Sequence, residues 1–283
     1  MKPTTKQSGF TLVELAIVLV IIGLIVGGVL VGQDLIKAAS IRSVITDLEK
    51  YNAAATTFRG KYNGLPGDLL NTKAFEFGLN ATAATDGNRD GSAGKGDGNG
   101  VIEACAVSAN GFGCETGLFW VDLSRAAFIP ASYNSYTSLT AALATANFAV
   151  NVPKTKLRDS TSVTVYNNAG RNYFAIGTTT MTAAIAAVAT AGPLSYTAST
   201  SAASLSPLEA RNMDEKMDDG SSQTGTVIAL PNGAMGAGTT TITPDAPGAS
   251  ANNRCVLTGG SYMVDTDSHA NNLACALSVR TSF

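Results

Sequence analysis

The chain carries little charge: charged residues make up 14% of its 283 residues, and the formal net charge is −2. Such a balance provides no basic surface of the kind that binds nucleic acid, so we predict no nucleic-acid partner. Histidine is almost absent, with His269 the only one, and the sequence contains neither an HExxH nor a G-x-S-x-G motif. We interpret the adjacent acids Asp218 and Asp219 as helix-end residues and not as a catalytic pair. The sequence therefore predicts a protein that is not an enzyme.

Cysteine is scarce, and its four residues fall into two local pairs, Cys105 with Cys114 and Cys255 with Cys275. Neither pair has the CxxC spacing of a zinc site or a thioredoxin motif. Four cysteines allow three disulfide connectivities, of which the two local loops are the simplest. If disulfides form, most of the chain lies in an oxidising compartment. Four free thiols in a cytosolic protein are the alternative, and the N-terminal segment argues against it.

Charge is missing altogether from Leu15 to Gly32, and these 18 residues are rich in Val, Ile and Leu. This length is about the minimum for a helix that spans a bilayer. A secretory signal peptide with Lys2 and Lys6 as its basic region is the competing interpretation. The apolar run is too long for the hydrophobic core of a typical signal peptide, however, and no A-x-A-like cleavage site follows.

The helical pattern continues beyond the apolar run. Apolar residues recur at spacings of three and four from Ile41 to Tyr62, and no proline interrupts the chain between Pro3 and Pro66. We therefore expect one helix over residues 10–62, about 80 Å long, with residues 10–33 in lipid or in the core of an assembly. A helix with an apolar face in solution is stable only when that face packs against another surface, so we expect it to have partners.

The segment Lys6-Gln7-Ser8-Gly9-Phe10-Thr11-Leu12-Val13-Glu14 resembles the processing site of type IV prepilins. The resemblance implies that residues 1–9 are a leader, that a prepilin peptidase cuts after Gly9, and that Phe10 is then methylated. It also implies that Glu14 pairs with the terminal amine of a neighbouring subunit, so we expect this acid to be unpaired in the lone subunit. Many members of the family have a proline in this helix. Here glycines stand instead, at Gly23, Gly27, Gly28 and Gly32, and small residues of this kind permit close helix packing in lipid.

Residues 63–283 are expected to form a globular head of α+β class. The patterns predict two helices, over residues 116–128 and from Ser206 to about Met217, together with a hairpin over residues 161–177 and a strand over residues 224–230. Trp120 is interpreted as a packing anchor. Leu65-Pro66-Gly67-Asp68 and several later motifs resemble a subset of pilin-like proteins. This resemblance implies a long N-terminal helix packed on an antiparallel sheet with variable loops.

A calcium site is predicted in the Asp/Asn/Gly-rich stretch 86–103. Asp86, Asn88 and Asp90 followed by Gly91 match the first six positions of an EF-hand loop, and Asp97 falls at the twelfth. A second, less regular cluster comprises Asp97, Asn99 and Glu103. An aspartate replaces the usual glutamate, however, no helices flank the loop, and such runs also form ordinary turns, which is the alternative.

Taken with the resemblance, these features predict a structural subunit of a type IV pilus or pilus-like filament. Its partners would be other copies of itself, other pilins and the prepilin peptidase. The chain would sit in the bacterial inner membrane with a periplasmic head, and afterwards in an extracellular filament or a periplasmic pseudopilus. The alternatives are a pseudopilin of a type II secretion system and a membrane-anchored minor pilin that acts as an adhesin-like binding module.

Overall fold

The computed structural model describes residues 11–79, 89, 91, 96–103, 115–133, 152–159, 161–168, 170–177, 204–231, 255–256, 261–262, 264, 273 and 275–283. The chain divides into two compact units, residues 1–40 and 41–283. Cys105, Cys114, Asp86, Asn88 and Asp90 lie outside the described residues, as do Gly9 and Phe10.

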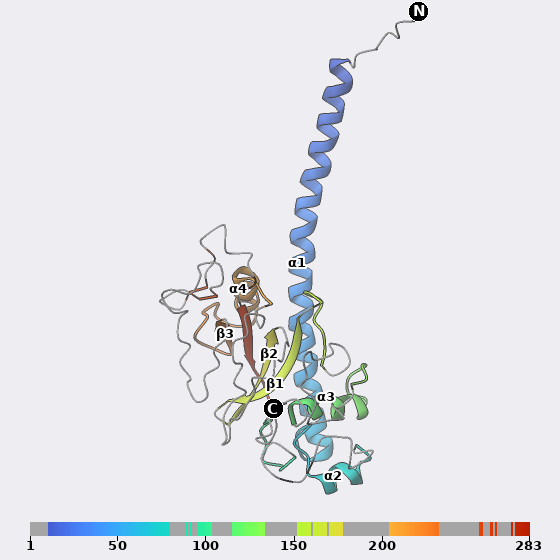
Figure 1. Ribbon diagram of the computed structural model, residues 1–283, viewed down its shortest axis with the longest axis vertical. Coiled ribbons are helices and arrows are strands. Elements are labelled where there is room, and N and C mark those ends of the chain that lie inside the picture. Colours follow the sequence, from blue (N-terminus) through green and yellow to red (C-terminus); the bar gives the residue numbers. More distant parts are fainter. Residues whose placement is uncertain are drawn as a thin grey trace, which may run out of the picture. The chain divides into compact units, whose positions relative to one another are not determined.

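The longest element is helix α1, Leu12–Tyr62, which confirms the single long helix that the sequence predicts (Figure 1). Its first part is apolar and exposed, whereas the part from Ile41 onward buries one face. The buried residues recur at the predicted helical spacing and are Ile41, Val44, Leu48, Ala54, Ala55, Phe58 and Tyr62. This periodicity explains why the second half of α1 belongs to the second compact unit.

The second unit contains a four-stranded antiparallel sheet in the order β1-β2-β4-β3. Its strands are β1 (Ser162–Asn168), β2 (Arg171–Gly177), β3 (Val227–Pro231) and β4 (Cys275–Arg280). The strand nearest the C-terminus is thus inserted between two earlier ones, with Phe174 of β2 and Val227 of β3 both opposite Val279. The long helix followed by this sheet makes the fold α+β, as predicted.

The hairpin prediction is confirmed in register, because Asn168 lies opposite Arg171 and Gly170 adopts a φ of 76° in the turn between them. Glycine suits that position since a side chain there would be strained. The strand predicted from residue 224 begins instead at Val227. The preceding residues form a turn, in which the carboxylate of Asp218 accepts hydrogen bonds from the backbone N–H groups of Thr226 and Val227.

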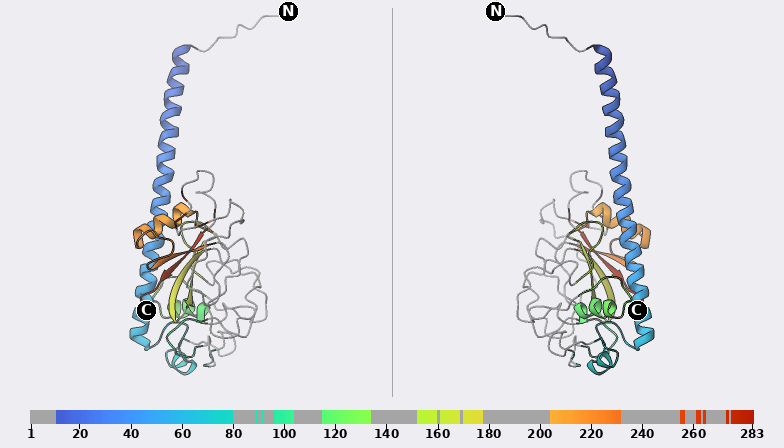
Figure 2. Two further views of the ribbon diagram at one scale, coloured as in Figure 1. Left: turned by 90° about the vertical axis from the view of Figure 1, so that its left-hand side faces the viewer. Right: turned by 90° about the vertical axis from the view of Figure 1, so that its right-hand side faces the viewer.

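Three shorter helices complete the described elements: α2 (Asn71–Glu76), α3 (Glu115–Arg125) and α4 (Pro207–Met217). The sequence predicts α3 and α4 but not α2. At the start of α4, Ser206 accepts from the N–H of Glu209 while the Glu209 carboxylate accepts from the N–H of Ser206, which is the predicted capping box. Figure 2 shows α4 (orange) near one end of the sheet and α3 (green) near the other.

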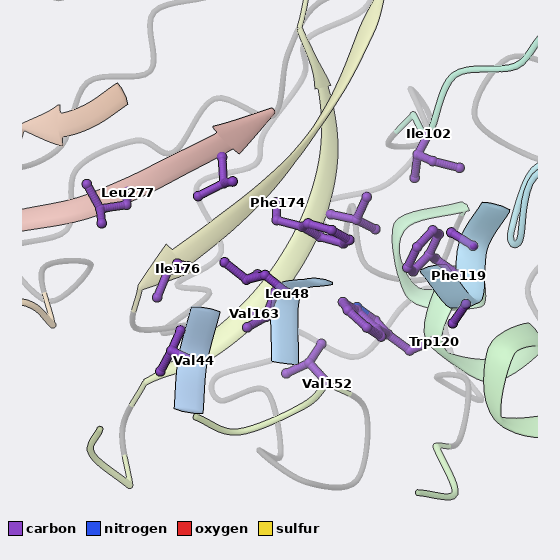
Figure 3. Close-up of a cluster of buried hydrophobic side chains, with 14 of the residues drawn as sticks. Val44, Leu48, Ile102, Phe119, Trp120, Val152, Val163, Phe174, Ile176 and Leu277 are labelled. Atoms are coloured by element: carbon purple, nitrogen blue, oxygen red, sulfur yellow. The ribbon is translucent and has the colours of Figure 1, made fainter. Parts of the chain in front are cut away.

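The core of the second unit lies where α1 and α3 meet the sheet. Val44 and Leu48 of α1 point toward Val163, Phe174 and Ile176 (Figure 3). Trp120 is fully buried, with its ring centroid 5.0 Å from that of Tyr51 and 6.2 Å from that of Phe174. Its predicted role as a packing anchor is therefore confirmed.

One disulfide lies within the described residues. Cys255 and Cys275 are joined, and Cys275 is the first residue of β4. The bond ties the segment around Cys255 to the middle of the sheet. The predicted partner loop, Cys105 with Cys114, stays a prediction.

Candidate functional site

Glu14 lies in the first turn of α1 and closes a local hydrogen-bonded ring with Thr11. Its Oε2 accepts from the backbone N–H of Thr11 at 2.8 Å and from the Thr11 hydroxyl at 3.0 Å. The hydroxyl oxygen in turn accepts from the N–H of Glu14 at 3.3 Å. This is a capping box, which satisfies N–H groups that a helix start leaves without partners.

Glu14 thus has hydrogen-bond partners within the lone subunit, whereas its ion pair with the amine of a neighbouring subunit stays a prediction. The carboxylate has hydrogen-bond donors, because the helix begins beside it and offers free N–H groups. Among the described residues, however, no basic side chain forms an ion pair with it. Its negative charge is thus held at a fixed place at the start of an apolar helix.

The apolar half of α1 is long and hydrophobic enough to cross a membrane, and its apolar window is 0% buried within the structure. Large side chains such as Leu24, at 76% exposed, face outward all around the helix. At each of Gly23, Gly27, Gly28 and Gly32, an added Cβ would meet no atom within 4 Å. These glycines are open notches in the surface of the helix, which a second helix in lipid can approach closely.

A group of three carboxylates lies in the second unit, at the start of α3. Oxygen atoms of Asp68, Asp97 and Glu115 lie within 4.8 Å of one another. Asp68 accepts from the N–H groups of Gly98 at 2.8 Å and Gly100 at 2.8 Å, and Glu115 accepts from those of Gly96 at 2.7 Å and Glu103 at 2.8 Å. The two acids thus hold the loop 96–103 by its backbone.

The sequence predicted neither Asp68 nor Glu115 as part of this group. Gly67 brings them together: its φ is +86°, and a Cβ at that position would lie 2.3 Å from the carbonyl oxygen of Glu115. Only glycine lets the turn at residues 65–68 press against the start of α3 in this way. Three carboxylate oxygens at such distances are suitable ligands for a hard cation.

The predicted calcium ligands are only partly described. Asp97, Asn99 and Glu103 do lie together, but through the Asn99 amide, which donates to Asp97 Oδ2 at 2.9 Å and to Glu103 Oε2 at 3.5 Å. In this arrangement the Asn99 amide nitrogen, not its oxygen, faces the two carboxylates. Calcium binding by residues 86–103 stays a prediction.

Burial changes the acidity of the two enclosed carboxyls. Burial raises the pKa of Asp68 to about 7; the N–H groups of Gly100 and Gly98 oppose this, and the charge of Asp97 adds to it. Burial likewise raises the pKa of Glu115 to about 8, against the N–H of Glu103 and with the charge of Asp68. The uncharged forms are therefore favoured in the folded protein relative to the unfolded chain.

The raised pKa values of Asp68 and Glu115 predict that the protein becomes less stable as the pH rises. Both folded pKa values exceed the unfolded ones, near 4, so the folded state binds up to about two more protons between pH 4 and pH 8. The free energy of unfolding should decrease across that window. Chemical unfolding of the detergent-solubilised chain, in EDTA to exclude cations, measures the slope.

The matched variant for that experiment is Asp68→Asn with Glu115→Gln, which should flatten the slope. A residual slope of the same sign should remain because burial also raises the pKa of Asp214 to about 6. A stability that rises with pH in the parent chain, or a slope that the double variant leaves unchanged, would contradict the assignment.

A second acidic group, Asp214 with Asp218 and Asp219, lies at the end of α4. Asp214 accepts from the Tyr262 hydroxyl at 2.8 Å, and Asp219 accepts from the N–H of Ser221 at 2.8 Å and from the Thr224 hydroxyl at 2.6 Å. These contacts fix the turn that leads into β3. They agree with the interpretation of Asp218 and Asp219 as helix-end residues.

Comparison with known proteins gives one match, at the N-terminus. No curated protein and no solved structure matches the chain. Residues 4–30 match the family model of the prokaryotic N-terminal methylation motif, and this stretch includes the Thr11–Glu14 capping box and the first part of the exposed apolar helix. The chain therefore carries the prepilin-type N-terminal signal, which supports a type IV pilin-like or pseudopilin protein.

Proposed function

We propose that this chain is the structural subunit of a type IV pilus or a pilus-like filament. The observation that carries the proposal is the exposed apolar half of α1, which follows Glu14 and whose first part, up to Leu30, lies within the methylation motif. A helix with apolar side chains all around it is stable in lipid or among other apolar helices, but not in water. Before assembly, the subunit would lie in the inner membrane with its head on the periplasmic side. During assembly, the apolar half of α1 would replace its contacts with lipid by contacts with the same helix of neighbouring subunits.

Cleavage and methylation of the N-terminus would precede assembly. A prepilin peptidase would remove residues 1–9 and methylate Phe10, which places a new amine four residues before Glu14. The carboxylate of Glu14 would pair with the amine of a neighbouring copy and set the register between helices. A pair of opposite charges held in a poorly hydrated place is favourable only when both partners are present and correctly placed.

A cleavage-site variant tests the processing step. Gly9→Val should leave residues 1–9 on the chain and prevent its recovery in surface filaments, because the branched side chain cannot occupy a site that accepts glycine. Intact mass spectrometry of the membrane fraction measures the retained leader, and Ser8→Ala is the matched control. A Gly9→Val chain that is found in filaments and begins at Phe10 would contradict the proposed cleavage site.

A further inference from the structure

The head of the molecule exposes an aromatic residue on α2. Phe75 is 75% exposed, and Phe77, which follows the helix, is 43% exposed although its ring contacts that of Tyr62 at 4.8 Å. Phe75 points outward because α2 is anchored by its neighbour, Ala74, which is fully buried. Single exposed apolar residues are common, but a large aromatic side chain exposed to this degree is also of the kind that anchors protein contacts.

A groove lies elsewhere on the same unit. It has a volume of about 430 Å³ and is lined by Tyr51, Ala53, Ala54 and Thr57 of α1 and by residues 128–130. Ala53 and Thr57 are small and exposed, so their side chains fill little of the groove. Phe128 and Ile129 contribute apolar side chains to its lining. Phe75 of the same chain is not among the residues that line it.

We propose that Phe75 of one copy inserts into this groove on the next copy. The proposal rests on the proposed function, since it assigns the contact between heads that would accompany packing of the apolar helices. A projection and a groove at different places on one chain produce a head-to-tail contact, which builds an open filament when the rotation between copies does not close a ring. Part of the groove is formed by α1, between residues 47 and 57.

Charge complementarity supports the same pairing. Glu76 is adjacent to Phe75 and is exposed. Asp47 and Lys50 also line the groove. The Lys50 side chain is 67% exposed, and its ion-pair partner among the described residues is Asp47, three residues away, at 3.2 Å. An exposed pair of this kind contributes little, so Lys50 can exchange Asp47 for the Glu76 of a neighbouring copy.

A charge swap in the full chain tests the contact. Glu76→Lys and Lys50→Glu should each reduce the amount of surface filament about five-fold, because each places like charges together. The double variant should restore assembly, since it recreates the pair in reverse. Glu49→Lys, a charge change on α1 outside the groove, is the control and should have no effect. Thermal unfolding should be the same in all four variants, because these side chains are exposed.

Photo-crosslinking locates the contact directly. A photoreactive amino acid at position 75, activated in assembled filaments, should join to peptides that contain residues 47–57 or 128–130 of a second copy. Crosslinks to another surface, or a double charge variant that stays defective, would overturn the proposal while leaving the filament function intact. A parent chain that forms no filaments would overturn both.

Discussion

Replacing Glu14 by leucine should reduce incorporation into filaments by about two orders of magnitude or more, while the chain still inserts in the membrane. Leucine is well suited to the apolar helix, so insertion and helix formation should not suffer. What is lost is the carboxylate that would pair with the amine of a neighbouring subunit. Leaving one partner of a poorly hydrated ion pair alone costs about 3–5 kcal/mol, which corresponds to more than a hundred-fold in an equilibrium.

Glu14→Gln separates the observed capping role of this side chain from its proposed pairing with a neighbouring amine. Glutamine can still accept from Thr11, as in the observed capping box, but it carries no charge. We therefore expect Glu14→Gln to assemble nearly as poorly as Glu14→Leu. The yield of sheared filaments, normalised to the amount of subunit in the membrane, is the measurement. Normal assembly of the glutamine variant would mean that Glu14 acts through the helix start and not through its charge.

Replacing Asp122 by alanine should destabilise the head by about 3–5 kcal/mol. Asp122 is fully buried on α3, and both of its carboxylate oxygens accept from Nη2 of Arg89, at 2.6 Å and 2.7 Å, while Nη1 of Arg89 donates to the Leu69 carbonyl. It also accepts from the N–H of Gly67 at 2.7 Å. Without it, a buried positive charge and a buried N–H lose their partner together, and neither can reach water.

The control for this variant is Arg211→Ala, which breaks an exposed pair with Glu215 in which both side chains are 45% exposed. It should cost less than about 1 kcal/mol. Denaturant unfolding of the solubilised chain, followed by the fluorescence of Trp120 in the neighbouring core, gives both values. If Asp122→Ala cost no more than Arg211→Ala, the buried pair would not be a main support of the head.

Elements with a strong local signal were predictable from the sequence. Three features depend on residues close together in the chain: the unbroken periodicity of α1, the β1–β2 hairpin turn with Asn168 and Gly170, and the Ser206–Glu209 capping box. In each case the neighbouring residues alone satisfy the backbone or define the buried face. The capping box of Thr11 and Glu14 has an equally local signal, although the resemblance to prepilins implies only a partner for Glu14 in another subunit.

The features that the sequence did not predict depend on distant residues. Strand β4 was not predicted although Cys275, Leu277 and Val279 alternate with smaller or polar residues, and its place between β2 and β3 depends on pairing with distant segments. The association of Asp68 with Glu115 depends on the contact of Gly67 with the start of α3. The predicted calcium ligands come from one continuous stretch, residues 86–103, to which neither acid belongs.

The central claim is that this chain is cleaved, methylated and polymerised through its N-terminal helix. Intact mass spectrometry of the subunit from sheared surface filaments, with fragmentation from the N-terminus, tests all three parts at once. The account predicts a chain that begins at Phe10, carries one added methyl group on its terminal amine and retains the Cys255–Cys275 disulfide. A chain found only in membranes and still beginning at Met1 would contradict the account.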